Sequence, residues 1–429
     1  MAGIKDAMNK GNGRVEIKGW VYRERKSNKF IFLVIRDSDD IIQCVVKRDS
    51  VSDKIWNATE KILVESSVVL KGEIKEDSRA PTGFEISVSD LEVVHYAEDF
   101  PINKDPSPEY LLDIRHLSLR TRKITAVMKI RSTVFGAIHE YYRKLGYYEY
   151  QSPSLISNPA EGGSSLFEVK YFDKKMFLTQ TWQLYAEAGI FALEKIYTLA
   201  PSFRAEKSKT ARHLTEYWHA EVEAAWMDLN GLQDLAEGLI KHIVFKVLEV
   251  NKKELEILGR DYRDLEPTAN KGFPRITYDQ ALKLLKEKFD FEIEWGKDLR
   301  TIEEDKLSSL YDTPVIITRY PKEVKAFYMK QDPENSKVVL CFDLIGPEGY
   351  GELIGASQRE ESIDELKAKL KKEGEDPKKY EWYLDTRKYG SVPHSGFGMG
   401  VERVVSWICK LDSIKDAIAF PRTIYRVLP

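Results

Sequence analysis

The sequence predicts an α+β protein in which a small five-stranded β-barrel precedes a larger domain of helices on an antiparallel sheet. Short segments rich in β-branched and aromatic residues succeed one another across residues 13–98, as the strands of a small β domain do. Beyond residue 124, strand-like segments of varied spacing mix with long helical segments. This mixture favours an α+β domain over regular βαβ winding. A chain of 429 residues is long enough for two or three domains.

The N-terminal part, residues 1–100, is expected to be a barrel of the OB type. Charged, glycine-containing or proline-containing turns separate its strands, and residues 49–66, after the third strand, are expected to form a short helix. Five strands with a helix after the third are typical of this barrel, and an unrelated small sandwich is the alternative. The candidate strands are residues 15–22, 30–37, 41–48, 67–74 and 84–94.

A linker or hinge is expected over residues 101–123, because this region is rich in proline and shows no clean period. Residues 124–146 then show helical periodicity, and Gly146 follows the expected end of the helix. A strand that reaches Pro153 follows. The apolar positions on one face of this helix are Val127, Ile130, Val134, Phe135 and Ile138. This stripe suits a subunit interface, although the domain's own core could also use it.

The remainder, residues 124–429, is expected to be one large domain. Residues 359–382 are expected to form an exposed, charged helix with one solvated face. The strand-like segments are residues 175–182, 195–203, 216–226, 314–321, 325–331, 336–346 and 395–400.

Composition excludes several classes of protein. The formal net charge is -3, so a nucleic-acid partner would need a local basic patch. The three cysteines lie far apart in the sequence, which excludes a zinc pattern or a disulfide framework and favours a reducing compartment. The first residues lack the apolar run of a signal peptide, and no apolar stretch approaches the length of a membrane span. We therefore expect a soluble, cytoplasmic protein.

Residues 203–223 (FRAEKSKTARHLTEYWHAEVE) read as strand, loop and strand. Alternation along the second strand would place an aromatic ring and two carboxylates on one face and core residues on the other. A cleft over the first face would bind a cation or an amide and stack a flat ring, whereas a solvated face would make this an ordinary amphipathic strand. The first face holds Tyr217, His219, Glu221 and Glu223; the second holds Trp218, Ala220, Val222, Ala224 and Trp226. The cations of the loop, which suit a polyphosphate, are Arg204, Lys207, Lys209, Arg212 and His213.

The segment SGFGMGVER near the C-terminus is a glycine-rich strand that runs into an apolar helix. Gly396, Gly398 and Gly400 permit close approach of a ligand to the backbone. Arg403, in the first turn of the helix, could lie flat against a nucleobase. A glycine-rich strand alone is weak evidence for a ligand-binding site, because many turns have this composition.

Taken in order, these segments resemble a known family over nearly the whole chain. The proline-terminated strand after the helix at 124–146, the FRAE loop with RHL, and GFGMGVER resemble motifs 1, 2 and 3 of class II aminoacyl-tRNA synthetases. A barrel ahead of the catalytic domain is similar to the aspartate, asparagine and lysine subgroup. FLTQTWQLYAEA, RHLTEYWHAEVE, GELIGASQRE and FPRT resemble the archaeal type of asparaginyl-tRNA synthetase.

The resemblance implies ATP-dependent ligation of L-asparagine to tRNA(Asn) through an asparaginyl-adenylate, in a cytoplasmic homodimer that uses Mg²⁺. Arg204 and Arg403 would be the catalytic residues. The implied ATP-binding residues are Arg204, Glu206, Arg212, His213, Tyr217, Glu352, Gly400 and Arg403. The implied metal ligands are Glu352, Asp343 and Ser357, hard oxygen donors as Mg²⁺ prefers. The PEGY insertion lengthens the spacing after Asp343, for which a turn or helix-cap role is the alternative.

The resemblance also implies an amino-acid pocket and an anticodon site. Arg359 would hold the substrate's side-chain oxygen, and Glu221 would face its NH₂ group. Ala186 stands where the aspartate enzymes carry a lysine, which favours an amide substrate. The implied amino-acid-binding residues are Glu161, Thr181, Gln183, Glu221, Glu223 and Arg359, with Glu161 on a closing loop. The implied anticodon-binding residues on the OB domain are Arg23, Arg25, Phe32 and Gln43.

Other functions stay open at this point. An aspartyl-tRNA synthetase, including one that also charges tRNA for asparagine, is the nearest alternative. An asparagine synthetase on the same catalytic fold would lack the barrel, and a regulatory tRNA-binding relative should have lost the motif arginines. Phe32 could instead be a core residue, because its strand alternates.

Overall fold

The computed structural model describes residues 3–102, 105–158, 160, 166–207 and 212–428. These residues divide into two compact units, Met1–Leu111 and Leu112–Pro429, and the division falls inside the segment expected to be a linker. No helix among the described residues is both long enough and apolar enough to cross a bilayer.

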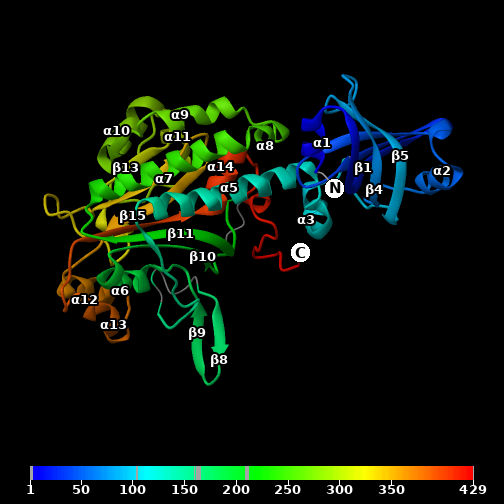
Figure 1. Ribbon diagram of the computed structural model, residues 1–429. Helices are drawn as coiled ribbons and strands as arrows, with labels where there is room; N and C mark the ends of the chain where they lie inside the picture. Colours follow the sequence, from blue (N-terminus) through cyan, green and yellow to red (C-terminus); the bar gives the residue numbers. More distant parts are fainter. Residues whose placement is uncertain (1–2, 103–104, 159, 161–165, 208–211, 429) are drawn as a thin grey trace. The chain divides into compact units, whose positions relative to one another are not determined.

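The first unit is a closed five-stranded barrel with the strand order β1-β2-β3-β5-β4 (Figure 1), which confirms the OB-type barrel. Side chains alternate along β2: Ile31, Leu33 and Ile35 are fully buried in the barrel core, whereas Phe32 is only half-buried. Ser52 caps helix α2, since its side chain accepts from the backbone N–H of Ile55. The elements are α1 (Ile4–Lys10), β1 (Gly13–Lys26), β2 (Phe30–Arg36), β3 (Ile41–Lys47), α2 (Asp53–Glu60), β4 (Ser67–Glu76) and β5 (Phe84–His95).

The second unit is built on an eight-stranded sheet with the order β12-β13-β14-β15-β16-β11-β10-β6. Its six central strands are antiparallel, and the two edge strands, β12 and β6, pair in parallel with their neighbours. The expected antiparallel sheet therefore describes the centre of the sheet but not its edges. The strands are β6 (Tyr148–Glu149), β10 (Lys195–Phe203), β11 (Glu216–Ala225), β12 (Arg275–Thr277), β13 (Val315–Thr318), β14 (Cys341–Gly346), β15 (Gly351–Gln358) and β16 (His394–Gly400).

Three long or apolar helices, α5 (Arg122–Lys144), α7 (Leu229–Val250) and α14 (Val401–Cys409), pack on one face of this sheet (Figure 1). The apolar stripe of α5 is buried in the unit's own core, so the stripe itself gives no argument for a subunit interface. Side chains alternate along β11: Ala220, Val222 and Ala224 meet the helices, which leaves the acidic face of the strand for the other side of the sheet.

The remaining elements complete the second unit and its boundary. A small sheet has the order β7-β9-β8. Its strands are β7 (Leu155–Ile156), β8 (Glu168–Tyr171) and β9 (Lys174–Leu178). The other helices are α3 (Pro108–Asp113), α4 (Arg115–Ser118), α6 (Gln183–Leu193), α8 (Lys252–Ile257), α9 (Glu266–Asn270), α10 (Tyr278–Phe289), α11 (Thr301–Ser308), α12 (Ile363–Lys372) and α13 (Glu381–Asp385).

Several local predictions were wrong. The strand expected to reach Pro153 ends at Glu149, and residues 325–331 contribute only isolated bridges at Met329 and Gln331. Strand β15 was not expected, because Gly351 and Gly355 dilute its strand signal.

The charged segment 359–382 is not a single helix. Helix α12 begins at Ile363, capped by Ser362, and Arg359 is buried ahead of it with 4% exposure. Trp226, expected in the core, lies just past the end of β11 with φ 60° and is 70% exposed. The turn at the strand end therefore breaks the alternation that placed Trp226 inside.

Candidate active site

Three adjoining hollows of about 650, 110 and 230 Å³ lie along the sheet, and residues at the start of α14 also line the second and third of them. The first and second share Arg204, His219, Glu352 and Gly398; the second and third share Arg212, His213, Glu352, Arg403 and Ile414. Because each hollow shares lining residues with the next, they form one continuous cleft along β11, β16 and β15.

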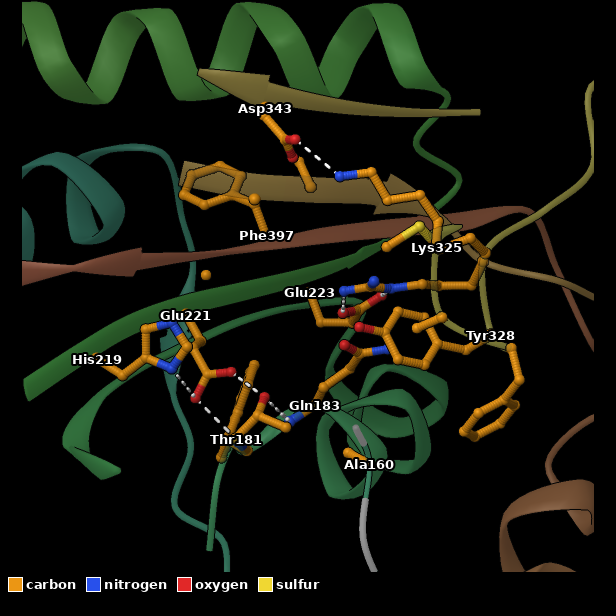
Figure 2. A pocket seen from close by; sticks show the side chains of 18 of the residues that line it. Ala160, Thr181, Gln183, His219, Glu221, Glu223, Lys325, Tyr328, Asp343 and Phe397 are labelled. Carbon is orange, nitrogen blue, oxygen red and sulfur yellow. Dashed lines mark hydrogen bonds and ion pairs between the residues drawn. The ribbon is translucent and has the colours of Figure 1, made fainter. Parts of the chain in front are cut away.

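The floor of the first hollow holds a buried ion pair between Arg359 and Glu223 (Figure 2). Nε and Nη2 of Arg359 donate to the two carboxylate oxygens of Glu223 at 3.0 and 2.8 Å, and Nη1 donates to the hydroxyl of Ser357 at 2.8 Å. Strand β16 must carry glycine here, because a Cβ at Gly396 would lie 2.1 Å from Glu223 Oε2. Three of the five N–H groups of Arg359 are used by these bonds, so N–H donors remain for a ligand oxygen.

The carboxylate of Glu221 lines the same hollow, beside His219 and Thr181 (Figure 2). It accepts from the hydroxyl of Thr181 and from the backbone N–H of Trp182 (2.9 Å), and His219 Nδ1 lies 3.4 Å away. Burial acts to raise the pKa of Glu221, but His219 and these hydrogen bonds outweigh it and lower the pKa. Glu221 is therefore a fixed negative charge in the cleft.

Acidic side chains gather where the three hollows meet. Burial and the neighbouring Glu352 and Asp343 raise the pKa of Glu304 to about 8. Burial raises the pKa of Asp343 to about 6 although Lys325 donates to its Oδ2 at 2.8 Å. Arginine and lysine neighbours, chiefly Arg403, lower the pKa of Glu352 against the effect of burial.

The space between Asp343 and Glu352 offers hard oxygen ligands. A Cβ placed on Gly355 would lie 2.8 Å from Glu352 Oε1 and 3.9 Å from Asp343 Oδ1, so both carboxylates border it. In the described part of the chain no three acidic, histidine or cysteine side chains are grouped closely enough to hold an ion by themselves. The pair fits a Mg²⁺ ion that takes its other ligands from phosphates and water. Ser357 is instead engaged by Arg359.

Basic and aromatic side chains line the second hollow. The guanidinium of Arg204 lies 5.8 Å from the ring centre of Tyr217. Arg403 Nη1 donates to the backbone oxygen of Glu352 at 2.6 Å, and Arg212 Nη2 donates to that of Gly349 at 2.6 Å. The hollow is built to take a flat ring beside anionic groups.

His213 borders the second and third hollows. Burial and the nearby arginines, Arg403 first, lower its pKa. Glu206, on the same loop, is exposed, and its carboxylate lies 4.0 Å from His213 Nε2.

The barrel carries a separate hollow of about 280 Å³, lined by Arg23, Glu24, Arg25, Phe32, Val34 and Gln43. Phe32 faces this hollow, while its neighbours Ile31 and Leu33 fill the core. Gln43 Nε2 donates to Glu85 Oε2 at 2.9 Å. An aromatic ring between two arginines and an amide is suited to an unpaired nucleobase.

Comparison with known proteins accounts for both units. Residues 107–424 match the family described as tRNA synthetases class II (D, K and N), and residues 15–94 match the OB-fold nucleic acid binding domain. The chain belongs to the class II tRNA synthetases. It is 49% identical to the asparagine–tRNA ligase of Thermococcus gammatolerans over 416 residues, which covers 97% of this synthetase and 96% of that protein. The corresponding ligase of Lactobacillus gasseri is 44% identical over 427 residues, 99% of both chains.

Solved structures agree with the sequence relatives. A crystal structure of asparaginyl-tRNA synthetase from Pyrococcus horikoshii complexed with asparaginyl-adenylate superposes on this synthetase with a TM-score of 0.96 at 48% identity, covering 100% of this chain and 99% of that one. A complex of the Entamoeba histolytica enzyme with the same adenylate gives a TM-score of 0.87 at 29% identity, covering 97% of each chain.

The structure brings most of the residues expected at the site into the cleft. Thr181, Gln183, Glu221, Glu223 and Arg359 line the first hollow. The residues expected at ATP line the second: Arg204, Glu206, Arg212, His213, Tyr217, Glu352, Gly400 and Arg403. Asp343 lines the first hollow. Glu161 lies outside the described residues.

Ala186 does not line the cleft. It is fully buried and packs with Trp182, Ile190 and Ile196. The structure therefore favours a packing role for Ala186 over a direct effect on the substrate.

Sequence reasoning missed Lys325 and Tyr328, which also line the first hollow of this synthetase. Both lie in the segment 325–331, which was predicted to be a strand. A lysine and a tyrosine in a predicted strand give no signal of a binding site. The juxtaposition of Lys325 with Asp343 depends on tertiary pairing, and no local pattern in the sequence reports it.

Proposed function

We propose that this synthetase ligates L-asparagine to tRNA(Asn) in two steps. In the first, the substrate carboxylate attacks the α-phosphorus of ATP and pyrophosphate leaves. In the second, a terminal hydroxyl of the tRNA attacks the carbonyl carbon of the adenylate, the aminoacyl ester forms, and AMP leaves. Neither step needs a protein nucleophile, so positioning and charge stabilisation supply the catalysis. Near-complete coverage of asparagine–tRNA ligases at 44–49% identity supports the activity.

The buried pair of Arg359 and Glu223 is the observation that carries the choice of substrate. Glu223 already compensates the guanidinium charge, so the floor of the hollow presents N–H donors without an unpaired positive charge. An amide can place its oxygen on Arg359 and its NH₂ toward a carboxylate. An aspartate side chain would bring a third carboxylate into a buried site that already holds Glu221 and Glu223.

The remaining roles follow the lining of the cleft. Arg204 binds the α-phosphate and the substrate carboxylate, and Tyr217 and Arg403 hold the adenine. Arg212 and His213 bind the outer phosphates, with Glu206 near the adenine amino group or the tRNA end. Contact of these side chains with a shared hollow supports the assignment.

Glu352 would hold the Mg²⁺ ion. Asp343 would hold it more weakly, because its carboxylate is already paired with Lys325. When bound, the ion neutralises phosphate charge. The amino-acid-binding residues proposed are Thr181, Gln183, Glu221, Glu223 and Arg359.

The proposed tRNA contact of the first unit is the hollow at Phe32, with Arg23, Arg25 and Gln43 around an anticodon base. We further propose a homodimer. Strand β6 is an open edge of the large sheet, and the neighbouring Leu145 and Tyr148 are 43% and 60% exposed. The three cysteines are free and buried, which agrees with a cytoplasmic location.

Pyrophosphate exchange driven by single amino acids tests the proposal. Asparagine should support ATP–pyrophosphate exchange without tRNA, and aspartate should support it far less. Exchange driven equally by both amino acids would instead favour an enzyme that does not discriminate, and exchange with neither would refute the function.

A further inference from the structure

A buried carboxylate lies behind the wall of the first hollow and has no role in the account above. Glu187 on α6 is fully buried and is not among the residues that line the hollow. Its Oε1 accepts from Nε2 of Gln183 at 2.9 Å. Gln183, by contrast, does line the hollow (Figure 2), so Glu187 can reach a ligand only through its neighbours.

The other oxygen of Glu187 is surrounded by donors. Arg387 donates to Oε2, and so does the hydroxyl of Tyr383 at 2.8 Å. That hydroxyl itself accepts from Arg387 Nη2 at 2.9 Å, so its single proton must point to Glu187. His394 Nε2 also lies 3.1 Å from Oε2. The Oε2 position must therefore be occupied by an acceptor.

The contact at Oε1 determines which end of the Gln183 amide meets a ligand. A carboxylate can only accept, so the amide nitrogen of Gln183 must turn toward Glu187. Its carbonyl oxygen is then the end on the hollow side of the side chain, and none of the described residues donates to it. The hollow thus presents a fixed hydrogen-bond acceptor beside Arg359 and Glu223.

We propose that Glu187 is a positioning residue that holds Gln183 as the acceptor for an N–H group of the bound amino acid. This inference rests on the proposed function, because the ligand is the amino acid of the exchange reaction. The N–H group can belong to the ammonium group, which asparagine and aspartate share, or to the asparagine side-chain amide.

The isosteric change Glu187→Gln should reverse the amide. The donors around Oε2 require the oxygen of the new side chain at that position, so its NH₂ group occupies the Oε1 position. Gln183 must then turn its own oxygen toward residue 187 and its NH₂ group toward the hollow. A donor facing a donor should raise the KM for asparagine about tenfold or more, with kcat changed much less.

Three matched variants separate orientation from structural damage. Tyr383→Phe removes a donor to the far oxygen, and Glu187→Asp shortens the side chain but keeps an acceptor-only carboxylate; both should stay within about threefold of the wild-type KM. The exchange variant Glu187→Gln/Gln183→Glu again turns an acceptor toward the hollow, so its KM should return toward the wild-type value. If Glu187→Gln alone does not fold, the double variant still tests whether an acceptor at position 183 restores asparagine binding.

The experiment measures pyrophosphate exchange kinetics with asparagine and with aspartate, and thermal unfolding, for each variant. An increased KM for both amino acids in Glu187→Gln assigns the N–H to the ammonium group; an increase for asparagine alone assigns it to the amide. A KM within twofold of wild type, a larger defect in Glu187→Asp than in Glu187→Gln, or no recovery in the double variant would overturn the inference. Failure of the wild type to use asparagine would instead refute the proposed function.

Discussion

Replacing Phe32 with alanine distinguishes tRNA binding by the barrel from adenylate formation in the cleft. Phe32 lies on the outer face of β2, where it lines the hollow with Arg23, Arg25 and Gln43. The barrel core is filled by the alternate residues of the same strand. Truncation at position 32 should therefore remove a ligand contact without opening a cavity.

The expected loss follows from the contact removed. One lost stack between a base and an aromatic ring is worth about 1–3 kcal/mol, or roughly 5–150-fold in kcat/KM for tRNA. Truncating the neighbouring core residue Leu33, which is fully buried, should instead cost about 2–5 kcal/mol of folding free energy. The two changes thus affect different measurements although the residues are adjacent.

The assay compares aminoacylation of tRNA with pyrophosphate exchange in the absence of tRNA. Phe32→Ala should impair only aminoacylation and leave the thermal midpoint nearly unchanged. Phe30→Ala is the matched control, because Phe30 lies on the same strand face, is 39% exposed and does not line the hollow. Loss of both activities together with stability, or an equal effect of Phe30→Ala, would refute an anticodon role for Phe32.

Four further predictions concern the second unit. Arg204→Ala and Arg403→Ala should each reduce pyrophosphate exchange about 10²–10³-fold or more with little loss of stability; near-normal exchange would remove that arginine from the site. Ala186→Lys should unfold at markedly lower temperature, since it buries an ammonium group in an apolar cluster, and full stability with altered selectivity would restore the direct role. Burial acts to raise the pKa of Glu187, but Arg387 and its neighbours outweigh it and lower the pKa. The ionised form therefore stabilises the fold above pH 4–5, and that contribution is lost as the pH falls. The difference in thermal midpoint between wild type and Glu187→Gln should shrink from pH 7 to pH 3, and a constant difference would contradict the ion-pair argument. Sedimentation at micromolar concentration should show a dimer, and a stable, active monomer would contradict the subunit interface.

Periodicity and turn composition predicted the elements whose side chains alternate regularly. The five barrel strands, α5 and the pair β10 and β11 all have one face in a core, and this burial imposes the pattern that the sequence displays. Strand β15 was not predicted because its glycines weaken the alternation of apolar and polar residues. Gly355 is required there, since a Cβ would lie 2.8 Å from Glu352 Oε1. Where the site needs small residues, local sequence signals are therefore least informative.

The candidate site divides in the same way. Glu221 and Glu223 could be placed on one strand face by alternation alone, and both do line the first hollow on that face. Lys325, Glu187 and Arg387 meet their partners across long sequence separations, so no spacing along the chain reports them. Arg204, Arg212 and Arg403 could be singled out from residue type and position alone, whereas the individual role of each was implied only by the family resemblance.

Exchange kinetics of the unmodified enzyme with asparagine and aspartate test the central claim most directly. The compensated pair of Arg359 and Glu223 and the fixed charge of Glu221 predict that kcat/KM for asparagine exceeds that for aspartate by about 100-fold or more. Equal values for the two amino acids, measured at the same ATP and Mg²⁺ concentrations, would contradict the account of the pocket.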